Sequence, residues 1–362
     1  MITITKTYLP PIEEYIGHLK DIWQKGWLTN DGDLVKDLAD YLRSYLNVPH
    51  LRLVANGTLA LQIAVKGLVL QGEIIKTPFS HIATTSAIIW EGCDPVFVDI
   101  ENKSFCIDAD LIEAAITERT SAILATHIYG YPCNVDKIEQ IARKYQLKII
   151  FDAAHAFGVK LNGRSITEHG DISALSFHAT KMFHTAEGGA IVCEDQDLAK
   201  RIYLMTRFGH LGEDDYFEVG INAKMSELHA AMGLAVLPMV DRIITRHKIH
   251  SEHYTELLAS LPLTLPALSP GLEYNYAYYP VIFDSHDTMQ RVRDTLQQRG
   301  TMPRRYFYPS LNTLPFLRPG LRRSCPISED ISDRILCLPL YYGMSNKDVH
   351  MIVDTVVRVL TT

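Results

Sequence analysis

Residues 148–155, Lys-Ile-Ile-Phe-Asp-Ala-Ala-His, decide how this chain is expected to fold. An apolar run followed at once by an acid, small residues and a histidine is typical of a buried strand ending in a polar crevice. Ligands of open parallel sheets bind at the carboxyl ends of the strands, so Asp152 is predicted to face such a site. Taken alone, Asp152 is explained equally well as the N-cap of a helix.

A second stretch with the same character is 174–181, Ala-Leu-Ser-Phe-His-Ala-Thr-Lys. A lysine held at the end of a buried strand is partly desolvated, which lowers its pKa and makes its amine a nucleophile able to form a Schiff base. Most lysines are simply exposed, so this interpretation of Lys181 depends on Asp152. A lysine together with an acid facing a pyridinium nitrogen is the pairing that pyridoxal phosphate chemistry requires.

A third stretch, 54–58, Val-Ala-Asn-Gly-Thr, precedes an apolar run with helical character. Gly57 permits close backbone approach, and Thr58 caps or opens a helix whose free N–H groups favour an anion. Such a turn by itself only marks the start of a helix. With the acid and the lysine downstream, it predicts the cradle for a cofactor's phosphate.

Helical and strand patterns alternate along the chain. We expect helices at 34–46, 58–70, 108–116, 135–145, 224–258 and 287–299, and strands at 95–99, 121–125, 148–152 and 278–283. This alternation predicts an α/β fold with a mostly parallel central sheet covered by helices on both faces. We divide the chain into a large domain, 1–245, and a smaller C-terminal α+β domain, 246–362.

The composition restricts the class of protein. The 362 residues carry a net charge of -7 and no run rich in Lys or Arg, which argues against nucleic-acid binding. No apolar stretch approaches the roughly 20 residues of a membrane span, and residues 1–11 lack a secretory signal pattern, so a cytoplasmic protein is expected. The six cysteines show no CxxC spacing, so we expect neither disulfides nor a metal site.

Four segments carry a resemblance to a known family: Asn56-Gly57-Thr58, 151–155, 176–181 and 187–190. Taken together they resemble the DegT/DnrJ/EryC1/StrS family, and the resemblance covers about residues 27–340 of this chain. The family consists mostly of nucleotide-sugar aminotransferases that use pyridoxal 5′-phosphate, and the resemblance implies their fold, fold-type I. It also implies that Lys181 binds the cofactor covalently and moves a proton between cofactor and substrate.

The resemblance implies further cofactor contacts, residue by residue. Asp152 would pair with the pyridinium nitrogen, and His155, where many relatives have Gln, would bond the cofactor's phenolic oxygen. The phosphate would be held by Gly57, Thr58 and Ser176. Asn222, within 220–227, would reach the phosphate of a neighbouring subunit, which makes a homodimer necessary.

His81 occupies a position where the family usually places an aromatic residue stacked on the cofactor ring. An imidazole can stack as well, so His81 is predicted to be the ring partner. The alternative is a histidine at a helix start that makes only a local hydrogen bond.

Residues 303–310, Pro-Arg-Arg-Tyr-Phe-Tyr-Pro-Ser, interleave cations with aromatic rings. Such residues suit a diphosphate and the face of a sugar or base, although a solvated linker has a similar composition. The resemblance places the segment near the substrate, so Arg304, Arg305, Tyr306 and Tyr308 are predicted to bind it. The sequence does not decide between the two arginines.

The resemblance implies a ping-pong transamination with L-glutamate as donor and a nucleotide-linked ketosugar as acceptor. The sequences of these segments are most similar to those of enzymes that aminate dTDP-4-keto-6-deoxyglucose at C4. The alternative substrate is a 3-ketosugar that is aminated at C3. O-antigen or lipopolysaccharide biosynthesis is the pathway this suggests. A catalytically idle relative is disfavoured because Lys181 and Asp152 are present, and a Rossmann dehydrogenase because no GxGxxG follows a predicted strand.

Overall fold

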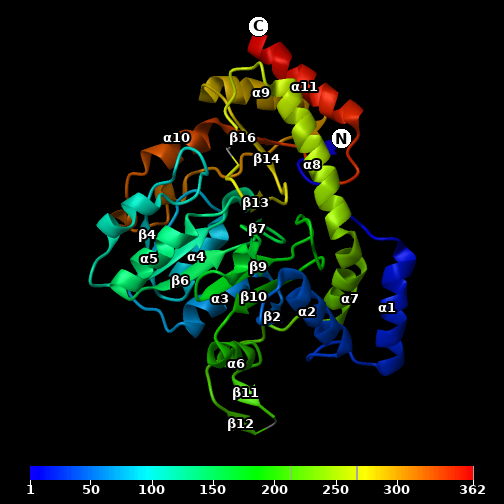
Figure 1. The fold of residues 1–362 in the computed structure, drawn as a ribbon, viewed down its shortest axis with the longest axis vertical. Coiled ribbons are helices and arrows are strands. Elements are labelled where there is room, and N and C mark those ends of the chain that lie inside the picture. Colours follow the sequence, from blue (N-terminus) through cyan, green and yellow to red (C-terminus); the bar gives the residue numbers. More distant parts are fainter. Residues whose placement is uncertain (213, 266–267, 362) are drawn as a thin grey trace.

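The centre of the protein is a seven-stranded sheet (Figure 1). The computed structural model describes residues 1–212, 214–265 and 268–361. In spatial order the strands are β2 (His50–Val54), β10 (Gly189–Cys193), β9 (Ile172–Ser176), β6 (Lys148–Asp152), β5 (Thr120–Thr126), β3 (Glu73–Lys76) and β4 (Asp94–Phe97). Only β10 runs antiparallel to its neighbours. The predicted mostly parallel α/β sheet is therefore confirmed.

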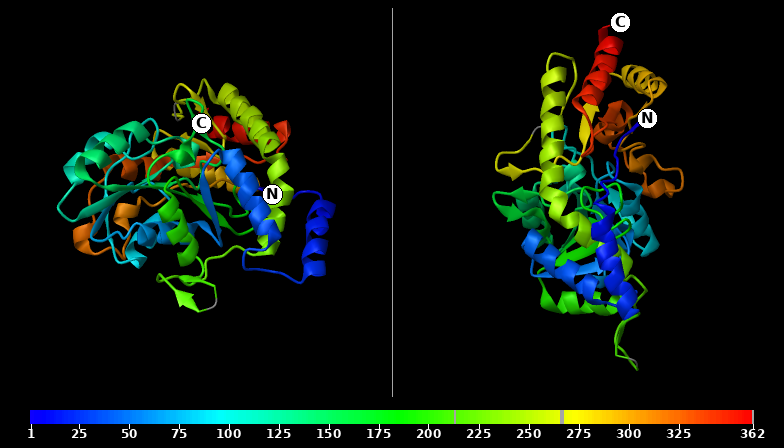
Figure 2. Two further views of the ribbon diagram at one scale, coloured as in Figure 1. Left: turned by 60° about the horizontal axis from the view of Figure 1, so that its bottom comes forward. Right: turned by 90° about the vertical axis from the view of Figure 1, so that its right-hand side faces the viewer.

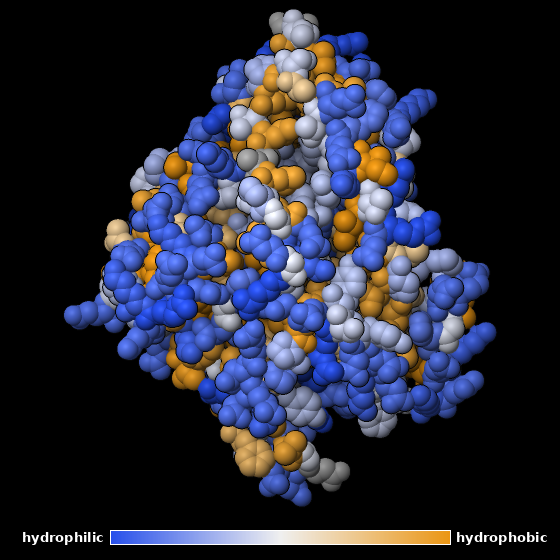
Figure 3. Space-filling view, viewed as in Figure 1, coloured by the Kyte–Doolittle hydropathy of each residue, from blue (hydrophilic) through white to orange (hydrophobic). Residues whose placement is uncertain are grey.

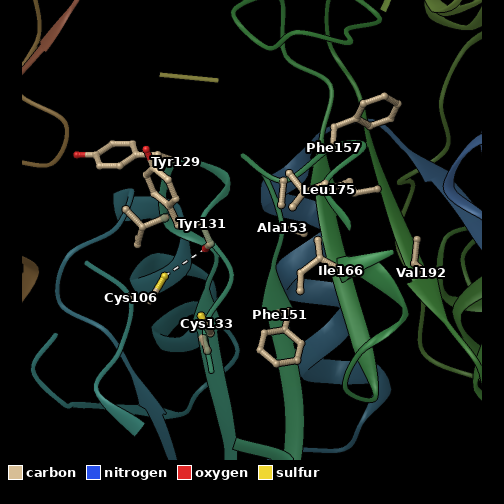
Figure 4. Packing of buried hydrophobic residues seen from close by; sticks show 14 of the residues in the cluster. Cys106, Tyr129, Tyr131, Cys133, Phe151, Ala153, Phe157, Ile166, Leu175 and Val192 are labelled. Carbon is tan, nitrogen blue, oxygen red and sulfur yellow. Dashed lines mark hydrogen bonds between the residues drawn. The ribbon is translucent and has the colours of Figure 1, made fainter. Parts of the chain in front are cut away.

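Alternation along the strands sorts apolar side chains into two cores, one on each face of the sheet. Ile123 and Phe151 belong to one core, whereas their chain neighbours Leu124 and Ile150 belong to the other. Figure 4 shows Phe151 in the first core with side chains from neighbouring strands. This core is covered by α2 (Asp33–Leu46), α5 (Val135–Tyr145) and α7 (Glu227–Val236), and the other by α3 (Gly57–Gly67), α4 (Ile82–Trp90) and α6 (Gln196–Met205).

The C-terminal part has a third core. Its elements are α8 (Val240–Leu258), β14 (Tyr279–Ile282), α9 (His286–Gln298), β16 (Ile335–Leu338) and α11 (Asn346–Thr361), with α10 (Pro326–Arg334) nearby. Helices α8 and α11 lie side by side (Figure 2). A separate core supports a second domain, but the predicted boundary falls inside α8, so the exact division remains a prediction.

Short strands complete the described fold. They are β1 (Ile2–Thr3) with β15 (Thr301–Met302), β7 (Lys160–Leu161) with β8 (Arg164–Ser165) and β13 (Leu272–Glu273), and β11 (His210–Leu211) with β12 (Asp215–Tyr216). All six cysteines are buried and free. In the described part of the chain, no group of His, Cys, Asp or Glu side chains is placed to hold a metal ion.

The helix predicted at 108–116 is wrong in type. The segment forms two short 3₁₀ helices, η1 (Ala109–Leu111) and η2 (Glu113–Ala115). Its buried residues are Ala109, Ile112 and Ala115, which recur every three positions. That spacing matches the three residues per turn of a 3₁₀ helix better than the 3.6 of an α-helix.

The prediction that no stretch is suited to a membrane span does not hold for one helical run, 227–258. Among the described residues, it alone is long and apolar enough to cross a membrane by length and composition. It contains α7, the turn η5 (Leu237–Met239) and α8, and it contacts α1 (Ile12–Lys25), α2 and α11. Ala230, Ala231 and Val236 of this run are buried inside the protein.

Candidate active site

A cavity of about 340 Å³ lies at the carboxyl ends of the parallel strands. Its lining includes Asp152, the last residue of β6, and Lys181, from the loop after β9. Strands β6 and β9 are adjacent and parallel, so they deliver the acid and the amine to the same crevice. The remaining predicted residues at the cavity are Gly57, Thr58, His81, His155, Ser176, Arg304 and Tyr306.

Lys181 lies in a tight loop, in which its backbone N–H donates to the carbonyl of His178 at 2.8 Å. Its Nζ donates to the Tyr278 hydroxyl at 3.4 Å and lies 5.9 Å from the centre of that ring. Burial lowers the pKa of Lys181 to about 8, although the charge of Asp152 opposes the shift. A larger fraction of its amine is therefore neutral and nucleophilic than in an exposed lysine.

Asp152 is almost completely buried, with 4% of its surface exposed. Burial raises the pKa of its carboxyl, while the N–H of Ala154 and the charges of Lys181 and Lys76 oppose the rise. Its Oδ1 accepts that N–H at 3.1 Å. Turns rather than a helix follow, so the N-cap interpretation of Asp152 is wrong.

His155 is a neutral hydrogen-bond donor held between aromatic rings. Burial lowers the pKa of its imidazole, and the charge of Lys181 lowers it further. Its Nδ1 accepts the backbone N–H of Tyr129 at 3.2 Å, which leaves Nε2 to carry the ring proton. The ring of Phe307 stacks on it at 5.6 Å with an interplanar angle of 4°.

Helix α3 begins beside Ser176. The Asn56 side chain accepts the N–H of Leu59 at 2.9 Å, so Asn56 caps the helix and Thr58 does not. A Cβ added to Gly57 would lie 2.8 Å from the Cβ of Ser176, so only glycine permits this approach. The first N–H groups of α3 and the Ser176 hydroxyl together form a site suited to a phosphate.

His81 makes the local hydrogen bond of the alternative interpretation, and its role as ring partner stays a prediction. It is the N-cap of α4, and its Nδ1 accepts the N–H of Ala83 at 3.2 Å. It also lines the cavity, where burial and the nearby Lys181 lower the pKa of its imidazole. The neutral ring is therefore available to stack on a flat cofactor.

Three predicted residues lie outside the cavity. Asn222 accepts a hydrogen bond from Lys224 Nζ at 2.8 Å. Arg305 donates to Asp333 Oδ1 at 3.1 Å, and its guanidinium lies 3.4 Å from the centre of the Tyr308 ring. Arg305 and Tyr308 therefore form a pair of their own away from the cavity.

The sequence interpretation missed several residues of the site. Tyr278 and Phe307 line the cavity, and the side chain of Thr126 lines it with a buried hydroxyl that has no partner. Tyr129 supports His155 from a left-handed backbone conformation, with φ of 56°. The only available signal was the density of aromatic residues around 274–279 and 306–308.

The cavity fits pyridoxal phosphate. The buried acid suits the ring nitrogen of the cofactor, and the lysine of lowered pKa suits its aldehyde. The neutral imidazole donor suits the phenolic oxygen, and the helix start close to Ser176 suits the phosphate. Fold and site together define a pyridoxal-phosphate-dependent enzyme of fold-type I.

Comparison with known proteins makes this class specific. A sequence model described as the DegT/DnrJ/EryC1/StrS aminotransferase family matches residues 11–357, and the chain belongs to that family. The enzyme is thus a pyridoxal-phosphate-dependent sugar aminotransferase. A dTDP-4-amino-4,6-dideoxy-D-glucose transaminase of Shigella dysenteriae is 38% identical over 359 residues, 98% of each chain.

Solved structures agree with the fold. The crystal structure of DesI, determined in the presence of its TDP-sugar product, superposes with a TM-score of 0.94 at 32% identity, covering 99% of this chain and 93% of that one. The sugar aminotransferase Spr1654 of Streptococcus pneumoniae, in its PMP form, gives a TM-score of 0.90 at 24% identity, covering 98% of this chain and 99% of that one. At that identity, the second match shows the fold alone.

Proposed function

We propose that this enzyme transfers the amino group of L-glutamate to C4 of dTDP-4-keto-6-deoxyglucose, giving dTDP-4-amino-4,6-dideoxyglucose. The observation that carries the chemistry is the meeting of Lys181 and buried Asp152 in one cavity. The substrate rests on the Shigella relative, whose name contains that product and which matches almost the whole chain. A cytoplasmic place in O-antigen or lipopolysaccharide synthesis follows as part of this proposal.

In this proposal each residue has a defined task. When bound, the cofactor supplies an electron sink for the negative charge that develops on the substrate carbon. Asp152 keeps the ring nitrogen protonated, and His155 donates from Nε2 to the phenolic oxygen. Lys181, released by the amino donor, carries the proton to and from the substrate carbon, for which its pKa of about 8 is well suited.

Arg304 is the proposed substrate-binding arginine. It lines the cavity and lies over the ring of Tyr306 at 4.9 Å. None of the ion pairs found in the described residues involves it, whereas Arg305 is already paired with Asp333. A free guanidinium beside an aromatic face is suited to the diphosphate of a nucleotide sugar or the carboxylate of the donor.

We further propose that the enzyme acts as a homodimer in which Asn222 reaches the partner's cofactor phosphate. Large apolar side chains are exposed on α1 and on the β11–β12 hairpin, and the hairpin protrudes at the bottom of the view in Figure 3. They include Ile12, Ile16, Trp23, Leu211, Tyr216 and Phe217. Exposed apolar surface of this kind is typical of a protein–protein contact.

Product analysis tests the proposal. The purified protein is incubated with dTDP-4-keto-6-deoxyglucose and L-glutamate, and the sugar is examined by mass spectrometry and NMR. A 4-amino product is expected. If the sugar is unchanged while glutamate alone alters the cofactor's visible absorption, the C4 proposal is wrong, and a 3-ketosugar becomes the acceptor to test.

A further inference from the structure

Lys76, the last residue of β3, is the feature of the site that the proposed mechanism leaves unused. Its side chain has no exposed surface, and no other lysine of the described residues is buried to this degree. Its Nζ donates to Ser80 Oγ at 3.2 Å and to Thr85 Oγ1 at 2.8 Å. Both acceptors are neutral, and no carboxylate lies within ion-pair distance of it among the described residues. A buried amine without a charged partner is costly, so its position calls for an explanation.

The charge that acts on this amine belongs to Asp152. Burial lowers the pKa of Lys76 to about 7, and Asp152 opposes that shift. Asp152 in turn feels two positive groups, Lys181 and Lys76. Lys181 faces the cavity and takes part in the proposed chemistry itself, whereas Lys76 does not line the cavity. Lys76 is therefore the basic group acting on Asp152 whose covalent state stays the same throughout the reaction.

A chain of hydroxyl groups connects the same amine to His81. Ser80 Oγ, which accepts from Lys76, lies 3.0 Å from Thr84 Oγ1. Thr84 Oγ1 donates to the backbone carbonyl of His81 at 2.6 Å. Lys76 thus supports, through Ser80 and Thr84, the turn that places His81 at the cavity.

We propose that Lys76 is a positioning residue of the active site: its fully buried amino group, bonded to Ser80 and Thr85, fixes the turn that carries His81 and favours the charged form of the Asp152 carboxylate opposite the cofactor's ring nitrogen. This inference rests on the proposed function, because it concerns the same cofactor. It assigns a role in the reaction to a side chain that touches neither cofactor nor substrate.

The test compares Lys76→Met, which keeps the length of the side chain but removes its charge, with Lys103→Met at an exposed lysine. The readouts are the dissociation constant of pyridoxal phosphate and the pH midpoint of its visible absorption. Loss of the buried charge should weaken binding about tenfold and raise the midpoint by about one pH unit, because a nearby cation favours loss of the chromophore's proton. Lys103→Met should match the parent.

A double-mutant cycle separates this role from simple packing. In an Asp152→Asn background there is no carboxylate to hold charged, so adding Lys76→Met should change the dissociation constant by less than about twofold. The third charged group acting on the pair, Lys181, is unchanged in all variants. Equal effects of Lys76→Met in both backgrounds would mean that it does not act through Asp152.

The remaining outcomes are also decisive. If Lys76→Met lowers the unfolding temperature but leaves both cofactor readouts at the parental value, Lys76 is only structural and the inference is overturned. If that variant does not fold, Lys76→Gln keeps a hydrogen-bonding group without the charge, and the same readouts decide. A parent protein that binds no pyridoxal phosphate would instead refute the proposed function itself.

Discussion

Strands β9 and β3 of the same sheet lead to two lysines of lowered pKa, partly buried Lys181 and fully buried Lys76, which differ in what they can reach. Lys181 lines the cavity and makes one long hydrogen bond, to Tyr278, whereas Lys76 is closed off and tied to two hydroxyl groups. Burial lowers the pKa of Lys181 to about 8 and that of Lys76 to about 7. A lowered pKa alone therefore does not identify the nucleophile, and access to the cavity distinguishes the two.

The strongest test of this distinction removes Lys181. In Lys181→Ala the turnover should fall about a thousandfold or more, because no other base can move the proton at the substrate carbon. Amino-sugar formation under saturating substrates measures this loss, and added pyridoxal phosphate should still bind without a covalent link. Turnover within about tenfold of the parent would mean that another amine, such as Lys76, can replace it.

The next largest effect is expected at Asp152. Replacing it by Asn should weaken pyridoxal phosphate binding about 10- to 100-fold, because a charge-assisted hydrogen bond is lost in a buried site. Equilibrium dialysis measures this. The matched control is Asp171→Asn, since Asp171 lies at the opposite end of the same strands and bonds the N–H of Ile149. Equal affinities in the two variants would contradict the assigned role.

Arg304 and Arg305 differ in the same way as the two lysines, because only Arg304 lines the cavity. Arg304→Ala should raise KM for the nucleotide sugar about tenfold, because the lost contact is to a charged group. Arg305→Ala should leave KM near the parental value and lower the unfolding temperature, since its contacts are to Asp333 and Tyr308. Steady-state kinetics at a fixed glutamate concentration measure KM for both variants. A raised KM in Arg305→Ala together with a parental KM in Arg304→Ala would reverse the assignment.

The smallest expected effect is a pH dependence. A base whose pKa is lowered to about 8 becomes neutral as pH rises through that value, so capture of added pyridoxal phosphate by the cofactor-free protein should increase about fivefold from pH 7 to pH 8. Borohydride reduction followed by peptide mapping measures it. The label should appear on Lys181, and a label on Lys76 would show that the interior opens to the cofactor.

Much of the site followed from local patterns. Asp152 and Lys181 could be predicted because each ends an apolar run, and parallel strands bring their carboxyl ends to one edge. Tyr278 and Phe307 could not, because they meet Lys181 and His155 only through tertiary packing between distant parts of the chain. No local pattern distinguishes a residue that packs in the interior from one that closes a cavity.

Other parts depended on finer balances. The burial of Lys76 could not be predicted, because strand-end lysines are normally exposed and its hydroxyl partners become acceptors only once α4 docks. The turns at 109–115 looked helical, since periods of 3 and 3.6 hardly differ over so short a segment. Arg304 and Arg305 are neighbours in sequence, and only folding separates their environments.

The cavity has two walls of different origin. The groups suited to the cofactor follow β6 and β9 or lie at the starts of α3 and α4, whereas Arg304, Tyr306 and Phe307 come from the C-terminal third of the chain. Under the proposed function, substitutions of Arg304 and Tyr306 should change which sugar is accepted, whereas Phe307 also supports the cofactor side because it stacks on His155. An enzyme built this way can diversify its substrates while its chemistry stays constant, and the 304–307 segment is where redesign for a new sugar should begin.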